Sequence, residues 1–145
     1  ALADWTWVFL GDRTEGEVAD VLGDALIAVV PGGSDGVPLV ALEAMASGCL
    51  VVAVDAGPLA DLLPEGYRFR YGDIVAAGQF IESAAAQLAT PEGRSQLTSR
   101  SLRGRELALA CSLDRQARSL DRAWRRIVAA SKQEGPDSRQ PVTAA

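Results

Sequence analysis

Along the first ninety residues, segments with the hydrophobic pattern of strands alternate with segments that have the pattern of helices. Uninterrupted apolar runs at residues 25–30 and 50–54 are typical of strands that are covered on both faces of a parallel sheet. An aromatic, β-prone run at 5–10 and an alternating run at 67–71 predict two further strands. Helical periodicity fills the segments between these runs. Strands that alternate with helices through short connections predict parallel pairing with right-handed crossovers.

Capping residues predict where the helices begin. Thr14 and Glu17 have the spacing of a Thr-x-x-Glu capping box, and Asp73 has the place of an N-cap. Thr90 followed by Pro91 is a cap followed by a first-turn proline. The expected helices are 15–23, the segment between Pro38 in its first turn and Gly48 just past its end, 58–63, 74–89, 91–109 and the segment that follows Ser112.

These elements predict an α/β domain over residues 1–133, with a Rossmann-like three-layer parallel sheet and additional C-terminal helices. Residues 134–145 have no periodicity and are expected to form a disordered tail. The chain begins just ahead of a predicted strand and without an initiator methionine, so we expect it to be part of a longer protein. In such sheets, small molecules bind outside the carboxyl ends of the strands.

Charge is divided unevenly along the chain. Residues 1–90 contain three basic and thirteen acidic residues, whereas residues 91–133 contain ten basic and four acidic ones. An acidic body with basic terminal helices does not fit a nucleic-acid-binding protein, which needs a continuous basic surface. The arginines have two interpretations: a solvated helix face, or a docking surface for another domain or for anionic lipid. No apolar run approaches the roughly 20 residues that span a bilayer.

Histidine is absent, and the two cysteines, Cys49 and Cys111, lie far apart in the sequence. This composition argues against zinc sites and histidine-dependent catalytic triads. We expect both thiols to be reduced, small core residues of a cytoplasmic protein.

A turn followed by a helix, residues 34–47, offers a binding chemistry. Gly36 lets the backbone approach a ligand closely, and the amides near Val37 and Leu39 would point outward at a helix N-terminus, which favours phosphate. Glu43 lies roughly 6–9 Å further along the helix axis, at 1.5 Å per residue. Asp35 would face a sugar beyond the phosphates. Glu43 would reach a ribose, whose two vicinal hydroxyls can donate hydrogen bonds to a carboxylate.

Each acidic residue also has an ordinary interpretation. Asp35 fits a turn or N-cap position, and Glu43 fits the wet face of a helix. However, Glu43 has apolar neighbours on both sides, which predicts a mostly buried helix whose charge needs a partner. This expectation favours a functional role.

The same residues carry a family resemblance. The stretch "DGVPLVALEAMASGCLVVA" resembles the signature of the large "group 1" family of retaining glycosyltransferases with two Rossmann-like domains, the GT-B fold. The segments "VFLG", "GYRFRYGD" and "CSLDRQARSL" agree with flanking features of that family, in the same order. From Trp7 to about Val128, the chain resembles the C-terminal, nucleotide-sugar-binding half of such an enzyme.

The resemblance implies a role for each matching position. Glu43 matches the family glutamate that binds the ribose hydroxyls of the nucleotide sugar, and Asp35 matches the acidic residue that contacts the transferred sugar near its reacting carbon. Gly36, Val37 and Leu39 match the loop that holds the sugar and diphosphate. The resemblance further implies retaining glycosyl transfer in carbohydrate biosynthesis, without a metal or other cofactor. Arg13 and Asp61 are additional candidates for donor contact.

Departures from the family pattern limit what this chain is expected to do alone. Asp35 stands where glutamate is usual, and Leu50 where proline is usual. The Arg/Lys pair that neutralises the diphosphate, and the N-terminal acceptor-binding domain, would lie upstream of residue 1. We therefore expect the isolated chain to be inactive, because a leaving diphosphate needs cationic stabilisation.

Two partner surfaces and one rival function follow from the resemblance. In complete enzymes of this kind the final helix crosses back onto the N-terminal lobe, and the stripe at Leu113, Leu120, Trp124 and Ile127 would suit that docking. The arginines leave peripheral contact with the inner face of a membrane as an alternative. The rival function, from another class, is a truncated or degenerate half that serves as a nucleotide-binding or protein-interaction module.

Overall fold

Three parallel strands form the sheet of the computed structural model, which describes residues 5–32, 39–63 and 67–133. Their order is β1 (Ile27–Val30), β2 (Leu50–Val54) and β3 (Arg68–Phe69), with β2 in the centre. Ile27 lies beside Leu50 in the register, and Ala53 lies beside Arg68. The predicted α/β class with a parallel, Rossmann-like sheet is confirmed.

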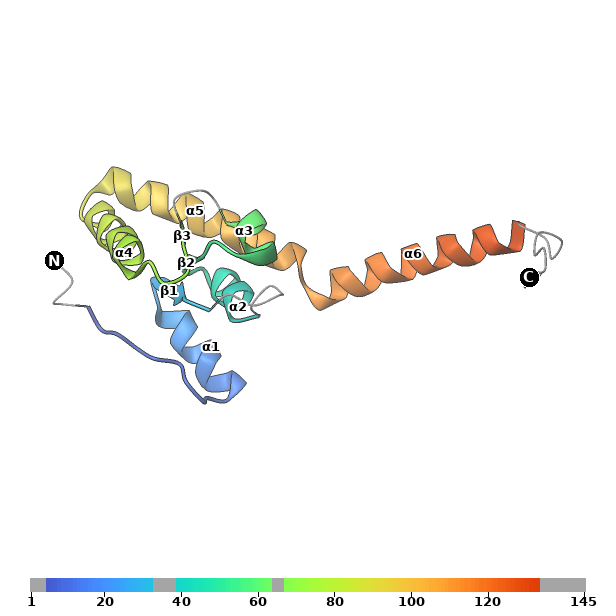
Figure 1. Ribbon diagram of the computed structural model, residues 1–145, viewed down its shortest axis with the longest axis horizontal. Helices are drawn as coiled ribbons and strands as arrows, with labels where there is room; N and C mark the ends of the chain where they lie inside the picture. Colours follow the sequence, from blue (N-terminus) through green and yellow to red (C-terminus); the bar gives the residue numbers. More distant parts are fainter. Residues whose placement is uncertain (1–4, 33–38, 64–66, 134–145) are drawn as a thin grey trace, which may run out of the picture. The chain divides into compact units, whose positions relative to one another are not determined.

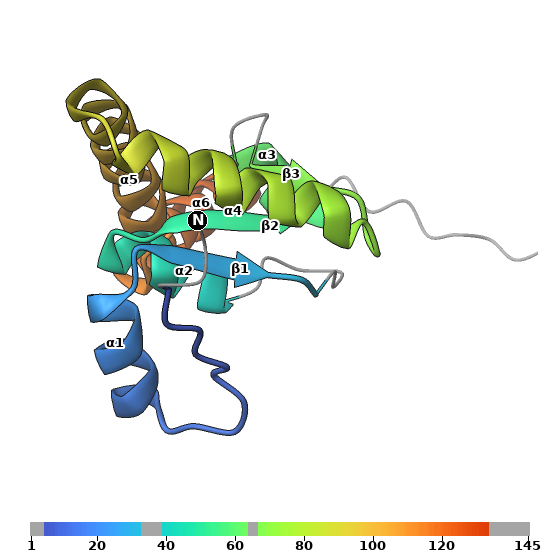
Figure 2. The same ribbon diagram turned by 90° about the vertical axis from the view of Figure 1, so that its left-hand side faces the viewer.

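Helices cover both faces of this sheet. Helices α1 (Glu15–Asp24) and α2 (Leu39–Ser47) pack on one face, and α4 (Ile74–Leu88) packs on the other (Figures 1 and 2). Helix α5 (Pro91–Ala110) contributes to both cores, with Leu97 on the side of α4 and Ala108 on the side of α2. The short helix α3 (Gly57–Leu62) follows β2. Strand β2 is buried throughout, with Val51 and Ala53 facing α1 and α2, and Leu50, Val52 and Val54 facing α4 and α5. An unbroken apolar run is the pattern expected of such a central strand.

Side-chain caps fix the helix starts as predicted. The Thr14 hydroxyl accepts from the Glu17 N–H at 3.4 Å, and Glu17 Oε2 accepts from the Thr14 N–H at 2.9 Å. Asp73 Oδ1 accepts from the Ala76 N–H at 2.9 Å at the start of α4. The Thr90 hydroxyl accepts from the Gly93 N–H in the first turn of α5, at 3.1 Å. These bonds satisfy amides that no helical carbonyl can reach.

Gly48 ends α2 in the left-handed conformation that its position predicts. Its φ is 92°, and its N–H donates to the Met45 carbonyl at 3.1 Å. The following Cys49 N–H donates to the Ala44 carbonyl at 2.9 Å, which completes a Schellman motif. The Ser101 hydroxyl of α5 donates to the Gly48 carbonyl. This end of α2 is therefore fixed to α5 and directed into β2.

The first predicted strand does not form. Residues 5–10 have no strand partner among the described residues, and Trp7, Val8 and Phe9 are exposed. A β-prone sequence becomes a strand only where a neighbour offers backbone hydrogen bonds, and none of the three described strands does so here. The predicted strand at 67–71 is also shorter than expected, because only Arg68 and Phe69 pair with β2.

The two cysteines have different surroundings. Cys49 is buried in the core between α1 and β2, where its thiol donates to the Leu22 carbonyl at 3.2 Å and the Ala25 carbonyl at 3.4 Å. Cys111 is only partly buried. Both are free thiols, and the predicted core position is confirmed for Cys49 alone.

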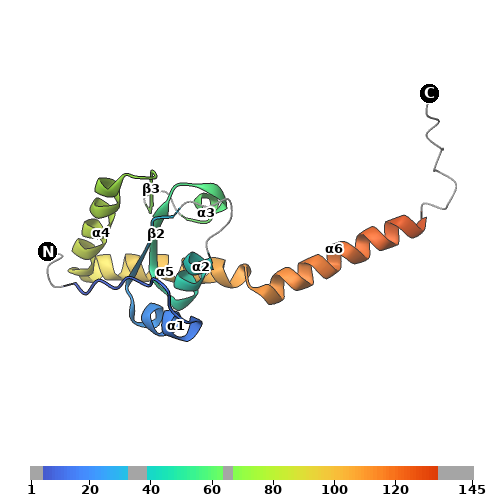
Figure 3. The same ribbon diagram turned by 60° about the horizontal axis from the view of Figure 1, so that its bottom comes forward.

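The chain divides into two compact units, residues 1–110 and 111–145. The described part of the second unit is dominated by α6 (Leu113–Gln133), one continuous helix (Figure 3). The tail predicted at residues 134–145 lies outside the described residues. Within the described residues, every helix is too short or too polar to cross a membrane.

Candidate functional site

The carboxyl ends of the three strands share one edge of the sheet, because all pairs are parallel. Strand β1 leads at this edge into Pro31 and Gly32, both exposed, and β2 leads into Asp55. Asp35, Gly36 and Val37 lie outside the described residues. The chain returns at Leu39, the first residue of α2, so the segment that carries these three residues joins the carboxyl end of β1 to the start of α2.

Helix α2 exposes the predicted ribose-binding residue. Ala41, Ala44 and Met45 are buried against the sheet, whereas Leu39 and Glu43 are exposed. Residues four apart in a helix lie on the same face, so Leu39 and Glu43 form one outward stripe. The expectation that Glu43 is buried was wrong, because the helix is apolar on average but contacts the sheet with one side only. An exposed carboxylate here needs no partner for folding, so burial no longer argues for a functional role, although the carboxylate is open to a ligand.

An ion pair that the sequence did not predict stands at the same edge. Arg68 Nη1 donates to Asp55 Oδ1 at 2.9 Å, joining the ends of β2 and β3. The Arg68 side chain is 25% exposed and that of Asp55 is 48% exposed. Arg68 Nε is buried and has no hydrogen-bond partner among the described residues. Only the strand register, which sets Arg68 beside Ala53, brings this arginine close to the aspartate that follows β2.

Glu43 and Arg68 carry opposite charges on different elements, α2 and β3. Glu43 can accept hydrogen bonds from hydroxyl groups, and Arg68 can donate to anionic oxygens while it keeps its bond to Asp55. From the sequence, no basic residue was expected near the turn of residues 34–38. In the structure Arg68 is the first residue of the two-residue strand β3 and the exposed Arg70 follows that strand, while the turn lies outside the described residues.

Arg13 and Asp61, the two additional candidates, are both exposed. Asp61 lies in α3, which follows the carboxyl end of β2. Arg13 lies directly before the capping box of α1. Hydrogen bonds from the Thr14 N–H and hydroxyl lower the pKa of Glu17, and the charge of Arg13 adds to this effect. Among the described residues, no hydrogen bond or ion pair joins Arg13 or Asp61 to Glu43 or Arg68.

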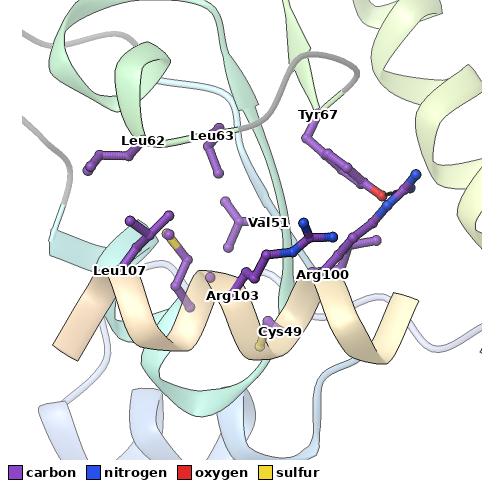
Figure 4. A pocket seen from close by; sticks show the side chains of 11 residues that line it. Cys49, Val51, Leu62, Leu63, Tyr67, Arg100, Arg103 and Leu107 are labelled. Atoms are coloured by element: carbon purple, nitrogen blue, oxygen red, sulfur yellow. Dashed lines mark hydrogen bonds between the residues drawn. The ribbon is translucent and has the colours of Figure 1, made fainter. Parts of the chain in front are cut away.

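The interior has a small cavity elsewhere (Figure 4). It measures about 50 Å³ and is lined mainly by apolar side chains of α2, β2, α3 and α5, including Met45, Leu63 and Leu107. Arg100 closes one side, with its Nη1 donating to the Tyr67 hydroxyl and its guanidinium 5.2 Å from the Tyr67 ring centre. Sites for small molecules are several-fold larger. This cavity is a packing gap with room for water-sized molecules.

Potential metal ligands do not gather in the described part of the chain. No three side chains of His, Cys, Asp or Glu stand together there in a group that could hold an ion. Glu43 and Asp55 belong to different elements, and Asp55 pairs with Arg68.

Comparison with known proteins identifies relatives of the first ninety residues. Residues 2–90 match the family described as "Glycosyl transferases group 1". A sulfoquinovosyl transferase of Arabidopsis thaliana is 37% identical over 73 residues, which cover 46% of this chain. The chain spans only 14% of the length of that protein. No solved structure matches the chain. The family match includes all three strands, helix α2 with Glu43, and the Asp55–Arg68 pair.

Proposed function

Because the chain belongs to the group 1 glycosyl transferases, we propose that it is the donor-binding, C-terminal half of a retaining GT-B enzyme. In this proposal the carboxyl edge of the sheet holds a nucleotide-diphosphate sugar. The complete enzyme would transfer the sugar to an acceptor bound by an N-terminal domain that is not among these 145 residues. Carbohydrate biosynthesis is the proposed setting.

The exposed position of Glu43 on α2 carries the proposal. Glu43 stands one turn into α2, the helix that follows β1 in the chain, and parallel sheets bind their ligands at the carboxyl ends of their strands. Glu43 is exposed, and no hydrogen bond or ion pair between described residues engages its carboxylate, which can accept from the two hydroxyls of a ribose. Leu39, on the same stripe, would contact the donor from the first turn of the helix.

The motif supplies the roles of the residues that precede α2. We assign Asp35 to the hydroxyls of the transferred sugar, close to the reacting carbon, and the amides of Gly36 and Val37 to the diphosphate. A helix N-terminus and glycine-rich backbone favour an anion there. The proposal includes no metal, so the leaving diphosphate needs cationic groups, which we assign to the acceptor-side domain. Alone, the chain would bind the donor without transferring the sugar.

The proposed cellular place is the cytoplasm, at the inner face of the membrane. The partners in this proposal are the nucleotide sugar, the acceptor-binding domain and the membrane surface. Nucleic acid is not among them, since residues 1–110 contain fifteen acidic and seven basic residues. The competing function is a purely non-catalytic module. The two differ in one outcome: if the proposal holds, adding the acceptor-binding domain restores sugar transfer, whereas a non-catalytic module would remain inactive.

A nucleotide titration tests the site. UDP, GDP and ADP are titrated calorimetrically against the wild-type chain and Glu43→Ala, with Glu82→Ala, an exposed helical glutamate of α4, as the matched control. We expect Glu43→Ala to weaken the preferred nucleotide roughly ten- to a hundredfold, because a hydrogen bond to a charged group is lost. Glu82→Ala should bind as the wild type does.

A second pair of ligands isolates the ribose contact. The preferred nucleoside diphosphate is compared with its 2′,3′-dideoxy form, which lacks the hydroxyls assigned to Glu43. The dideoxy form should bind wild type and Glu43→Ala equally, since the interaction is then missing in both. If Glu43→Ala weakened both nucleotides to the same extent, Glu43 would not be the ribose ligand.

A further inference from the structure

Asp55 and Arg68 lie on the face of the sheet that α1 and α2 cover. The Asp55 N–H donates to the Phe69 carbonyl at 2.7 Å, which continues the backbone ladder between β2 and β3 beyond Val54. Side chains alternate along a strand, so Asp55 points to the same face as the buried Ala53. Arg68 is the register partner of Ala53 and points to that face as well. The 2.9 Å contact from Arg68 Nη1 to Asp55 Oδ1 agrees with this placement.

The connection from β1 to α2 starts at the same edge as Asp55. Val30, the last residue of β1, lies beside Ala53 in the register, so Gly32 and Asp55 each follow a register pair by two residues. Neighbouring strands are about 4.8 Å apart, and parallel strands leave the sheet at one edge. The chain beyond Gly32 leads to α2, which covers the face to which Asp55 points. Asp55 therefore stands beside the start of the connection that carries the proposed donor-binding residues.

Asp55 has one carboxylate oxygen that no described residue engages. Its Oδ1 accepts from Arg68, whereas Oδ2 makes no hydrogen bond or ion pair within the described part of the chain. Arg68 is the more buried partner, so it holds the carboxylate from the inner side and offsets its charge. A carboxylate accepts hydrogen bonds from hydroxyl groups and repels phosphate. The pair thus offers an oriented acceptor for a hydroxyl-bearing group.

We propose that Asp55 binds a hydroxyl of the sugar in the nucleotide-sugar donor, and that Arg68 is a positioning residue that orients Asp55. This inference rests on the proposed donor site and deepens it with a sugar contact from outside the turn and helix of the motif. The sugar is assigned to Asp35, three residues after Gly32, whereas the ribose is assigned to Glu43, well within α2. Asp55, beside the start of the connection, therefore meets the sugar end of the donor.

Deoxy sugars test this contact at constant ligand charge. Calorimetry with the full chain first compares UDP-glucose, GDP-mannose and ADP-glucose, and the tightest ligand is then compared with its 2-, 3-, 4- and 6-deoxy forms. For at least one form, we expect roughly tenfold weaker binding than for the parent, because a hydroxyl that donates to a carboxylate is missing. Asp55→Ala should bind that form and the parent equally, since the acceptor is absent. Asp20→Ala, at an exposed aspartate of α1, is the matched control and should keep the wild-type ratio.

The variant Arg68→Met separates positioning from direct contact. It should reduce the parent-to-deoxy ratio roughly threefold, because a partly exposed ion pair contributes up to about a factor of five and Asp55 could then turn away. The double variant Asp55→Ala/Arg68→Met should give the same ratio as Asp55→Ala, because Arg68 acts on the sugar only through Asp55. A lower ratio in the double variant would show that Arg68 contacts the sugar itself and would overturn its positioning role. Circular dichroism checks that each variant is folded.

The remaining outcomes separate this inference from the proposed donor site. If Asp55→Ala weakened the parent and all four deoxy forms equally, the pair would serve only to hold β2 to β3, and the inference would be overturned. An equal change in Asp20→Ala, or wild-type binding of a nucleoside diphosphate but of no nucleotide sugar, would overturn it too. In these cases the ribose contact of Glu43, measured with the nucleotides alone, could still hold. A chain that binds no nucleotide would remove both.

Discussion

At the scale of single residues, two glycines of α5 show how local space decides the effect of one methyl group. A Cβ built on Gly93 would stand 2.1 Å from the backbone carbonyl oxygen of Gln87, far inside contact distance. A Cβ on Gly104 would meet only the side chain of Met45, at 3.7–3.9 Å. The first neighbour is backbone and cannot yield easily, whereas the second is at ordinary contact distance and flexible.

The two glycine-to-alanine substitutions should therefore have opposite signs. Gly104→Ala should raise the free energy of unfolding by about 1 kcal/mol, because alanine is the better helix former and gains contact with Met45. Gly93→Ala should lower it by roughly 1–3 kcal/mol, because α5 must shift away from Gln87. Urea unfolding followed by circular dichroism measures both. Equal effects of the two substitutions would contradict the packing described for α5.

Cys49 gives the stability a dependence on alkaline pH. Burial raises the pKa of its thiol above the ordinary 9.0, a shift only partly opposed by a hydrogen bond from its own backbone N–H. Above pH 9 the unfolded chain loses this proton while the folded chain keeps it, which favours unfolding. The contribution of Cys49 is thus complete below pH 9 and declines as pH rises toward the folded pKa.

Urea unfolding between pH 8 and 10.5 measures this decline, with Cys49→Ala as the reference. The variant is expected to be less stable at neutral pH, since it loses buried volume, but to show a shallower alkaline slope. Identical slopes would mean that Cys49 ionises as easily in the fold as in the unfolded chain. In addition, Ellman's reagent should modify Cys111 rapidly and Cys49 only upon unfolding.

At the scale of elements, local signals predicted most helices and the two main strands, and non-local pairing accounts for the failures. The caps at Thr14 and Asp73 and the terminal glycine of α2 act within a few residues, so the sequence alone shows them. Residues 5–10 were predicted as a strand from composition, but a strand also needs a neighbour, which no local pattern specifies. The exposure of Glu43 was missed because average apolarity does not give the face of a helix.

The same difference between local and non-local signals applies to the candidate site. The turn motif makes Asp35 and Glu43 candidates without any structure, through chemistry carried by adjacent residues, and their roles stay a prediction. The Asp55–Arg68 pair joins residues thirteen positions apart, and only the register of β2 and β3 makes them neighbours. Pairs of this kind form only once the strands have assembled into a sheet. The hydrophobic periodicity of the sequence therefore does not predict them.

The Asp55–Arg68 pair should contribute modestly to the pairing of β2 with β3. Both side chains are partly exposed, so water and salt screen the interaction, and a double-mutant cycle with Asp55→Asn and Arg68→Met should give a coupling of about 0.5–1 kcal/mol. The methionine keeps the apolar stem of Arg68 in place. Repeating the cycle at high salt should reduce the coupling. A coupling near zero at low salt would show that the pair does not stabilise the fold.

At the scale of the whole molecule, the two units differ in what holds them together. Residues 1–110 enclose cores on both faces of the sheet, while no residue of α6 from Leu113 to Ser131 is buried. A helix of 21 residues held by its backbone bonds alone is only marginally stable in water. Local opening should therefore be far easier in α6 than in α5, although both helices are long and rich in arginine.

Limited trypsin digestion tests this difference directly, because trypsin cleaves after arginine and needs an opened backbone. The first cuts should fall after Arg115, Arg118 or Arg122 in α6, leaving a resistant fragment that retains α5. Arg100 and Arg103, which line the cavity against Tyr67 and Met45, serve as the internal comparison and should be cut late. Early cleavage at Arg100 or Arg103 would instead place the weak point of the molecule in α5.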